Sequence, residues 1–194
     1  DWPALLAQSS ARPVWLVIAN LLTALRLALA APVALAFALP GVMSAASLVA
    51  VILLAMATDV ADGRSARRFG TASSRGMLFD HVTDFIFVTS ALAGLAYAGL
   101  IGSLLPILIV VAFSQYVLDS YFLFRQKSLK MSFLGRWNGV FYFFPLVLFS
   151  LAALEALPTT LSEIISTGGK LLVWVLTLST LASIADRAIA PLRE

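Results

Sequence analysis

Long apolar runs alternate along the chain with short connections that contain glycine, proline or charged residues. A helix needs about 20 apolar residues to cross the hydrocarbon core of a bilayer. Six stretches come close to that length: residues 14–39, 42–61, 77–98, 103–124, 140–157 and 168–189. The pattern therefore predicts an all-α integral membrane protein with six transmembrane helices.

The N-terminal segment has a different pattern. Residues 2–12 place Trp2, Leu5 and Leu6 among polar neighbours, which suits a short helix lying in the membrane interface. A frayed tail fits the same residues equally well. Because no internal repeat, low-complexity tract or linker divides the chain, residues 1–194 are expected to form a single domain.

The composition supports a membrane protein and excludes several kinds of chemistry. The chain is 61% hydrophobic and 12% charged, with a mean hydropathy of +0.97, whereas soluble domains are about half apolar. Cysteine is absent, which excludes disulfides, a thiolate nucleophile and cysteine-based metal sites. We interpret the net charge of +3 as favouring contact with anionic lipids rather than with nucleic acid.

The basic residues lie on one side of the predicted topology. All the lysines and arginines except Lys170 fall near the N-terminus, after the second or fourth predicted helix, or near the C-terminus: Arg12, Arg26, Arg64, Arg67, Arg68, Arg75, Arg125, Lys127, Lys130, Arg136, Arg187 and Arg193. By the positive-inside rule, both termini and these two connections are expected to face the cytoplasm.

Acidic residues gather at the predicted cytoplasmic ends of the second and third helices. Asp59 and Asp62 stand three residues apart, and Asp80 and Asp84 stand four apart, so each pair shares one helix face. Four carboxylates at one membrane depth would repel one another, and ionisable groups there are usually partnered or functional. A divalent cation relieves the repulsion, and hard oxygen ligands favour Mg²⁺ or Mn²⁺ over zinc.

The residues between the two pairs suit a phosphate group. Gly63 and Ala66 keep the surface low, and Arg67 offers a bidentate fork of donors. A loop is expected to lead into the third helix, whose N-terminus favours anions and where Gly76 permits close approach of the backbone. Metal and phosphate binding together indicate a diphosphate site.

These residues and spacings resemble the signature of the CDP-alcohol phosphotransferase (CDP-alcohol phosphatidyltransferase) family. The fixed positions of that signature correspond to Asp59, Asp62, Gly63, Ala66, Arg67, Gly76, Asp80 and Asp84. The predicted six-helix layout and the cytoplasmic position of the motif are also similar to that family. The resemblance implies a metal-dependent transfer in which an alcohol attacks the phosphate of a CDP-linked lipid and CMP leaves.

The resemblance also implies a role for each residue of the motif. Asp59, Asp62 and Asp80 would hold two Mg²⁺ or Mn²⁺ ions, while Asp84 would complete the second metal site and act as the base on the acceptor hydroxyl. The CDP moiety would contact Asp62, Gly63, Ala66, Arg67 and Gly76. Phosphoryl-type transfers depend mostly on alignment and charge neutralisation, which two metals and one arginine can supply.

The first predicted helix carries a further set of polar residues. Asn20, Thr23 and Arg26 stand three apart on one face, at positions similar to those in family members that use CDP-diacylglycerol. The resemblance therefore adds Asn20 and Thr23 to the expected CDP-binding residues. An interfacial cap with a snorkelling arginine is the alternative interpretation.

Candidate acceptor-binding residues follow in the fourth helix and after it. Arg125 and Arg136 suit a phosphorylated acceptor, although the positive-inside rule also accounts for basic residues there. Gln115 and Asp119, four residues apart, can bond acceptor hydroxyls or another helix. The corresponding region of phosphatidylglycerophosphate synthases resembles Gly-Lys-x-Lys-Thr. Here residues 135–139 read Gly-Arg-Trp-Asn-Gly, so the first basic residue is present as arginine and the second is lost. Glycerol 3-phosphate, inositol phosphate, an unphosphorylated alcohol and a lipid all stay open as acceptors.

The favoured function is a phosphatidyltransferase of phospholipid synthesis with CDP-diacylglycerol as donor and a polar alcohol or its phosphate as acceptor. The short chain suits a bacterial inner membrane, and the resemblance suggests a homodimer. The runner-up is an enzyme that transfers from a CDP-linked small alcohol to a lipid. A divalent-cation transporter would need acidic residues deeper in the second and third helices, where the sequence has none, and a silent scaffold would not need both Arg67 and Asp84.

Overall fold

The computed structural model describes residues 21–69, 74–118 and 133–189, with side chains for 21–60, 78–118 and 134–189. All the regular elements in these ranges are helices, as predicted: Leu21–Ala38, α2 (Ala45–Phe69), α3 (Ser74–Tyr97), α4 (Leu104–Leu118), α5 (Phe133–Phe141), α6 (Phe143–Ala152) and α7 (Thr159–Ile189). The expected interfacial helix at 2–12 lies outside the described residues.

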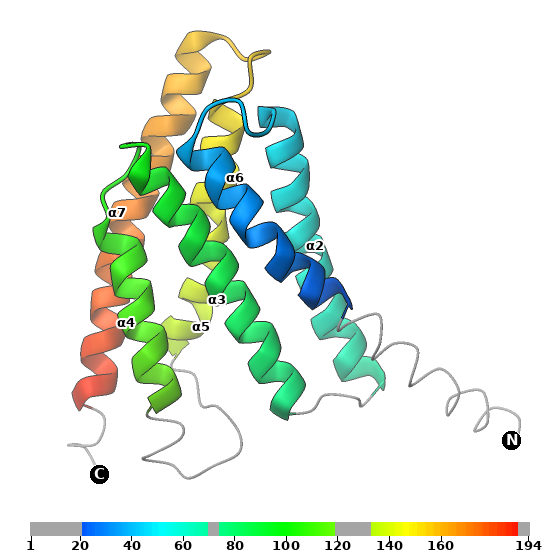
Figure 1. Cartoon of the computed structure of the whole chain (residues 1–194). Coiled ribbons are helices and arrows are strands. Elements are labelled where there is room, and N and C mark those ends of the chain that lie inside the picture. Colours follow the sequence, from blue (N-terminus) through cyan, green and yellow to red (C-terminus); the bar gives the residue numbers. More distant parts are fainter. Residues whose placement is uncertain (1–20, 70–73, 119–132, 190–194) are drawn as a thin grey trace, which may run out of the picture.

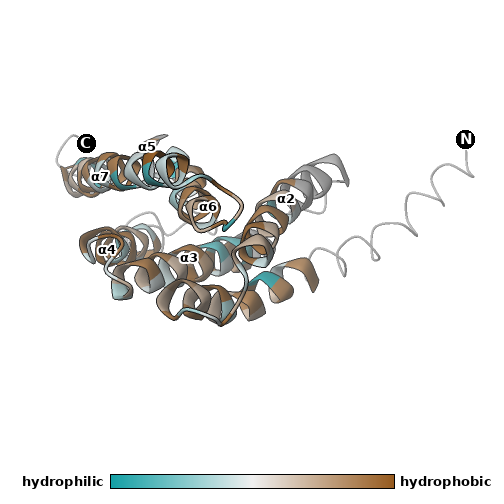
Figure 2. Ribbon diagram, turned by 90° about the horizontal axis from the view of Figure 1, so that it is seen from above, coloured by the Kyte–Doolittle hydropathy of each residue, from teal (hydrophilic) through white to brown (hydrophobic). Residues whose placement is uncertain are grey.

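The helices run lengthwise through the molecule and turn at its two ends (Figure 1). One end of the molecule holds the last residues of α2, α4 and α7 and the first residues of α3. The opposite end holds the turns that follow the first helix, α3 and α6. Seen along the helices, α7, α5 and α6 lie opposite α4, α3 and the first helix, with α2 beside α6 (Figure 2). This alternation agrees with the predicted distribution of the basic connections.

Three of the helices are long and apolar enough to cross a membrane: Leu21–Ala38, Leu78–Tyr97 within α3, and Thr159–Ile189. Two further apolar stretches, Ala45–Val60 and Leu104–Leu118, are shorter. Six transmembrane helices therefore stay a prediction. Large apolar side chains such as Trp174 and Leu178 are exposed on the outside of α7, where a bilayer would cover them.

The two helices of the charged motif are longer than predicted. The sequence pattern ended the second helix at residue 61 and began the third at 77, with a loop between them. In the structure α2 continues to Phe69 and α3 begins at Ser74. The residues after residue 61 end the apolar run but not the helix, because several of them are arginine or alanine, which are strong helix formers. The motif is therefore carried almost entirely by helix.

The fifth predicted helix, residues 140–157, corresponds to α5 and α6, which begin earlier and end at Ala152. The interruption is slight, since Tyr142 keeps a helical backbone and its N–H bonds to the Asn138 carbonyl at 2.9 Å. Pro145 has no N–H to offer to the carbonyl of Phe141. One missing hydrogen bond thus explains the division.

The last helix also begins earlier than predicted, at Thr159 rather than Gly168. Its first turn is held by the Pro158 carbonyl, which accepts the N–H groups of Leu161 and Ser162 at 3.0 Å. The glycines that suggested a connection lie inside the helix instead. A Cβ placed on Gly169 would lie 3.1 Å from the Phe149 ring, so this glycine permits close packing of α6 on α7.

The core lies between the first helix, α2, α3 and α6. Ile52, Phe87, Leu92 and Leu146 are fully buried there. At Gly94 of α3 an added Cβ would collide with the backbone carbonyl oxygen of Ala34. The first helix and α3 therefore approach closely, and this contact aligns the two helices that carry charged residues further along.

We predict that Gly94→Ala lowers the stability of the protein, by about 1–3 kcal/mol if the helices must separate. Gly168→Ala is the matched control, because that glycine is also inside a helix but has open space around it, so alanine should be neutral or stabilising there. Thermal unfolding in detergent, followed by size-exclusion chromatography, measures both. Equal unfolding temperatures for the two variants would contradict the close contact.

Candidate active site

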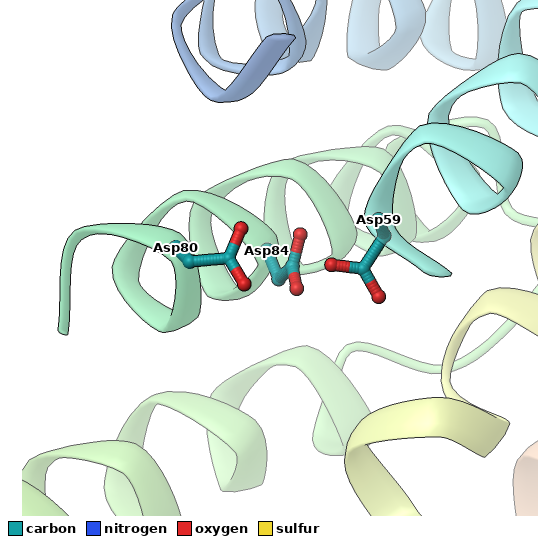
Figure 3. A group of neighbouring side chains, drawn as sticks. All are labelled: Asp59, Asp80 and Asp84. Carbon is teal, nitrogen blue, oxygen red and sulfur yellow. The ribbon is translucent and has the colours of Figure 1, made fainter. Parts of the chain in front are cut away.

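Three aspartates converge between α2 and α3. Asp59 lies on α2, while Asp80 and Asp84 lie one turn apart on α3 and point toward it (Figure 3). One carboxylate oxygen from each residue lies within 4.8 Å of the other two. Their side chains are 33%, 27% and 24% exposed, in that order. The group is thus half-buried and can still be reached from outside.

Arg26 of the first helix reaches into this group. Its Nη1 lies 3.3 Å from Asp59 Oδ1, 3.2 Å from Asp80 Oδ1 and 2.5 Å from Asp84 Oδ1. Its Nη2 donates to Thr58 Oγ1 at 3.5 Å. Only 1% of the side chain is exposed, so the alternative of a snorkelling arginine at the interface is wrong. Arg26 is a buried ion-pair partner of all three aspartates.

The charges in this group do not balance. Three carboxylates face one guanidinium, which leaves a formal excess of two negative charges among the described side chains that touch one another. Uncompensated like charges in a partly buried site are costly. The excess can be relieved by a bound cation, and a divalent ion would match it.

The three aspartates fit a hard divalent cation. They offer carboxylate oxygens that meet around one point, and oxygen ligands of this kind select Mg²⁺ or Mn²⁺. Asp62 stands three residues after Asp59 within α2, which places it on the same helix face. Its side chain lies outside the described ones, so its part in the metal site stays a prediction.

The expected CDP-binding residues follow from the ends of the same helices. Gly63, Ala66 and Arg67 lie in the last turns of α2, and Gly76 lies in the first turn of α3. Of these residues only Gly76 was expected in the loop, and it lies on α3 instead. Thr23 is buried one turn before Arg26, and Asn20 lies outside the described residues.

The acceptor-binding predictions have a different outcome. Gln115 donates from Nε2 to the Ile184 carbonyl of α7 at 3.3 Å, which is the contact between helices that was the alternative interpretation. Arg136 is exposed on α5. Asp119 and Arg125 lie outside the described residues. An acceptor pocket therefore stays a prediction.

Two polar features were not recognised from the sequence. The first is the contact of Arg26 with the aspartates, for which a lone arginine in an apolar helix was the available signal. The second is a set of polar contacts with α7. Ser179 donates to Asn138 of α5 at 2.7 Å, and Tyr142, between α5 and α6, pairs with Thr180 at 2.7 Å. The spacing of Thr177, Thr180 and Ser183, three residues apart, indicates such a face.

The comparison with protein families agrees with the geometry. The family model described as CDP-alcohol phosphatidyltransferase matches residues 16–185, a range that includes Arg26 and the three aspartates. No curated protein matches the chain at a significant level.

We predict that Asp84→Asn weakens Mn²⁺ binding by about tenfold or more, because it removes one of the converging carboxylates. In other metal sites, substitution of a residue that only hydrogen-bonds to a metal ligand already reduces metal affinity by about that factor. Electron paramagnetic resonance of free Mn²⁺ during titration of the purified protein measures the affinity. Glu163→Gln, at an exposed position of α7, is the matched control. Equal affinities for the two variants would exclude Asp84 as a ligand.

Proposed function

Because the chain belongs to the CDP-alcohol phosphatidyltransferase family, we propose that it moves the phosphatidyl group from CDP-diacylglycerol to a polar alcohol or alcohol phosphate, with release of CMP. Glycerol 3-phosphate and inositol phosphate are the acceptor types that we favour. The observation that carries the proposal is the convergence of Asp59, Asp80 and Asp84. These residues lie inside the range that matches the family, whose members transfer substituted phosphate groups.

The proposed chemistry uses two Mg²⁺ or Mn²⁺ ions. Asp59, Asp62 and Asp80 would hold them, and Asp84 would contribute to the second site. Bound metal would neutralise the charge of the diphosphate and polarise the phosphoryl group under attack. Arg67 at the end of α2 and the N-terminus of α3 at Gly76 would bind the diphosphate oxygens.

Asp84 is proposed as the base. Its carboxylate would accept the proton of the acceptor hydroxyl while the hydroxyl oxygen forms a bond to phosphorus. The bond from phosphorus to the CMP oxygen breaks in the same transfer, and CMP carries the electron pair away. In the structure Asp84 Oδ1 is 2.5 Å from Arg26 Nη1, so release of this contact would make that oxygen available as the proton acceptor.

The apolar helices and the family make the chain an integral membrane protein. We propose that it lies in a bacterial inner membrane as a homodimer, with both termini and the aspartates on the cytoplasmic side. The basic residues near that side support this orientation. A soluble acceptor would enter from the cytoplasm, and the diacyl tails would remain in the bilayer, since leaving it costs about 0.8 kcal/mol for each CH₂ group.

Release of CMP by the purified protein tests the reaction. With CDP-diacylglycerol and Mg²⁺ or Mn²⁺, we expect CMP to appear only when the right acceptor is added. The panel contains glycerol 3-phosphate, inositol, inositol phosphate, serine and phosphatidylglycerol. Release of CMP from a CDP-linked small alcohol with a lipid acceptor, and not from CDP-diacylglycerol, would favour the runner-up function instead.

Asp84→Asn tests the base. The variant should lose turnover while binding of CDP-diacylglycerol stays detectable, since the amide cannot take the proton. Glu163→Gln, the exposed control, should retain turnover. If Asp84→Asn retained turnover, another group would be the base; if it lost donor binding as well, Asp84 would act mainly as a metal ligand.

Arg136→Ala tests the acceptor pocket. If the acceptor carries a phosphate that Arg136 binds, the variant should raise the KM of the acceptor much more than the KM of the donor, because a charge-assisted hydrogen bond contributes about 1.5–3 kcal/mol. Lys170→Ala removes a positive charge from α7 and serves as the control. Equal increases in both KM values would exclude this pocket.

A further inference from the structure

The position of Arg26 Nη1 coincides with the point where the three carboxylates meet. This one nitrogen lies within 3.3 Å of an oxygen of Asp59, Asp80 and Asp84, and the three carboxylates are the group that fits a metal ion. An arginine remains charged at any pH the protein meets. The guanidinium therefore supplies positive charge where a divalent cation would supply it.

We propose that Arg26 is an internal counter-ion of the metal site. Its guanidinium occupies the cation position among Asp59, Asp80 and Asp84 when no metal is bound, and a divalent ion binds by displacing it. This inference rests on the proposed function, because the family chemistry supplies the ion. It assigns to Arg26 a role in metal loading that differs from binding of the substrate.

The guanidinium and the ion cannot share this place. A metal ion needs its ligand oxygens at about 2.1 Å, whereas Nη1 already contacts those oxygens at 2.5 to 3.3 Å. Two cations held by the same oxygens would repel strongly in a half-buried site. Binding of the metal must therefore turn the Arg26 side chain away, and this frees Asp84, which makes the shortest of the three contacts.

The remaining contacts of Arg26 are weak enough to permit such a movement. Its Nη2 lies 3.5 Å from Thr58 Oγ1, at the long limit of a hydrogen bond. Its Nε is buried and has no partner among the described residues. A buried donor without a partner is costly, so the observed position of Arg26 is stabilised mainly by the three carboxylates.

Mn²⁺ affinity without substrate tests the inference. Arg26→Met removes the competing charge and should bind Mn²⁺ about tenfold tighter than the wild type, equivalent to about 1.4 kcal/mol. Arg26→Lys, which retains a charge, should stay closer to the wild type. Lys170→Met, which removes a positive charge from a different helix, α7, should have the same Mn²⁺ affinity as the wild type. Unchanged or weaker binding by Arg26→Met would overturn the inference.

The same titration separates this inference from the proposed function. If the wild type does not bind Mn²⁺, the metal-dependent function fails and the inference fails with it. If the wild type binds Mn²⁺ and Arg26→Met binds it no more tightly, only the role of Arg26 fails.

A stability measurement decides the question if Arg26→Met does not survive purification without metal. The variant is then prepared with MnCl₂, and the metal is removed with a chelator. Because its three carboxylates then have neither the Arg26 guanidinium nor the metal ion beside them, the unfolding temperature should fall much further than that of the wild type. Equal decreases for the two proteins would overturn the inference.

Discussion

The need to neutralise a buried arginine determines how the first three helices meet. Arg26 cannot lose its charge, and a charge enclosed in an apolar helix bundle costs several kcal/mol unless it is paired. Asp59 from α2, with Asp80 and Asp84 from α3, provides that pairing. The three helices are therefore joined at one depth by these four side chains. Further along, the absence of a side chain at Gly94 lets α3 approach the first helix closely.

The same residues that join the helices also supply the charge on which the proposed reaction depends. Three carboxylates around one guanidinium leave negative charge in excess, and this excess attracts a divalent ion and opposes the approach of a diphosphate that carries no metal. Stability and the proposed metal binding would thus depend on the same aspartates. An arginine that offsets part of their charge in the absence of metal can keep the helices together until the ion and the donor arrive. The family match makes phosphoryl-type transfer the chemistry that uses this charge.

Much of the site could be predicted from the sequence, because helical periodicity fixes which residues share a face. The spacing of Asp80 with Asp84 was sufficient to place these two carboxylates together, whereas the place of Asp62 beside Asp59 stays a prediction. The partner of Arg26 could not be predicted, since one arginine in an apolar run fits both a snorkelling and a buried position. Only the packing of the first helix against α2 and α3 distinguishes them. For the same reason, the acceptor pocket depends on contacts between helices that local spacing does not determine.

The helix boundaries show a similar limit. The glycines before the last predicted helix were interpreted as part of a connection, which is a common role of glycine. In this bundle Gly169 instead accommodates the ring of Phe149, and Pro145 interrupts one hydrogen bond without ending the span. The first effect arises from a tertiary contact, and the second arises from the N–H group that proline lacks. The all-α class was predictable because it depends on the length of apolar runs alone.

We propose that the aspartates joined by Arg26 form the metal centre of the transferase. Anomalous diffraction from crystals of the protein grown with Mn²⁺ is the decisive measurement, because the signal locates the ion without reference to activity. We expect a manganese peak between Asp59, Asp80 and Asp84, with the Arg26 guanidinium moved away from their oxygens. A peak elsewhere, or Arg26 still bound to all three aspartates beside an occupied metal site, would contradict it.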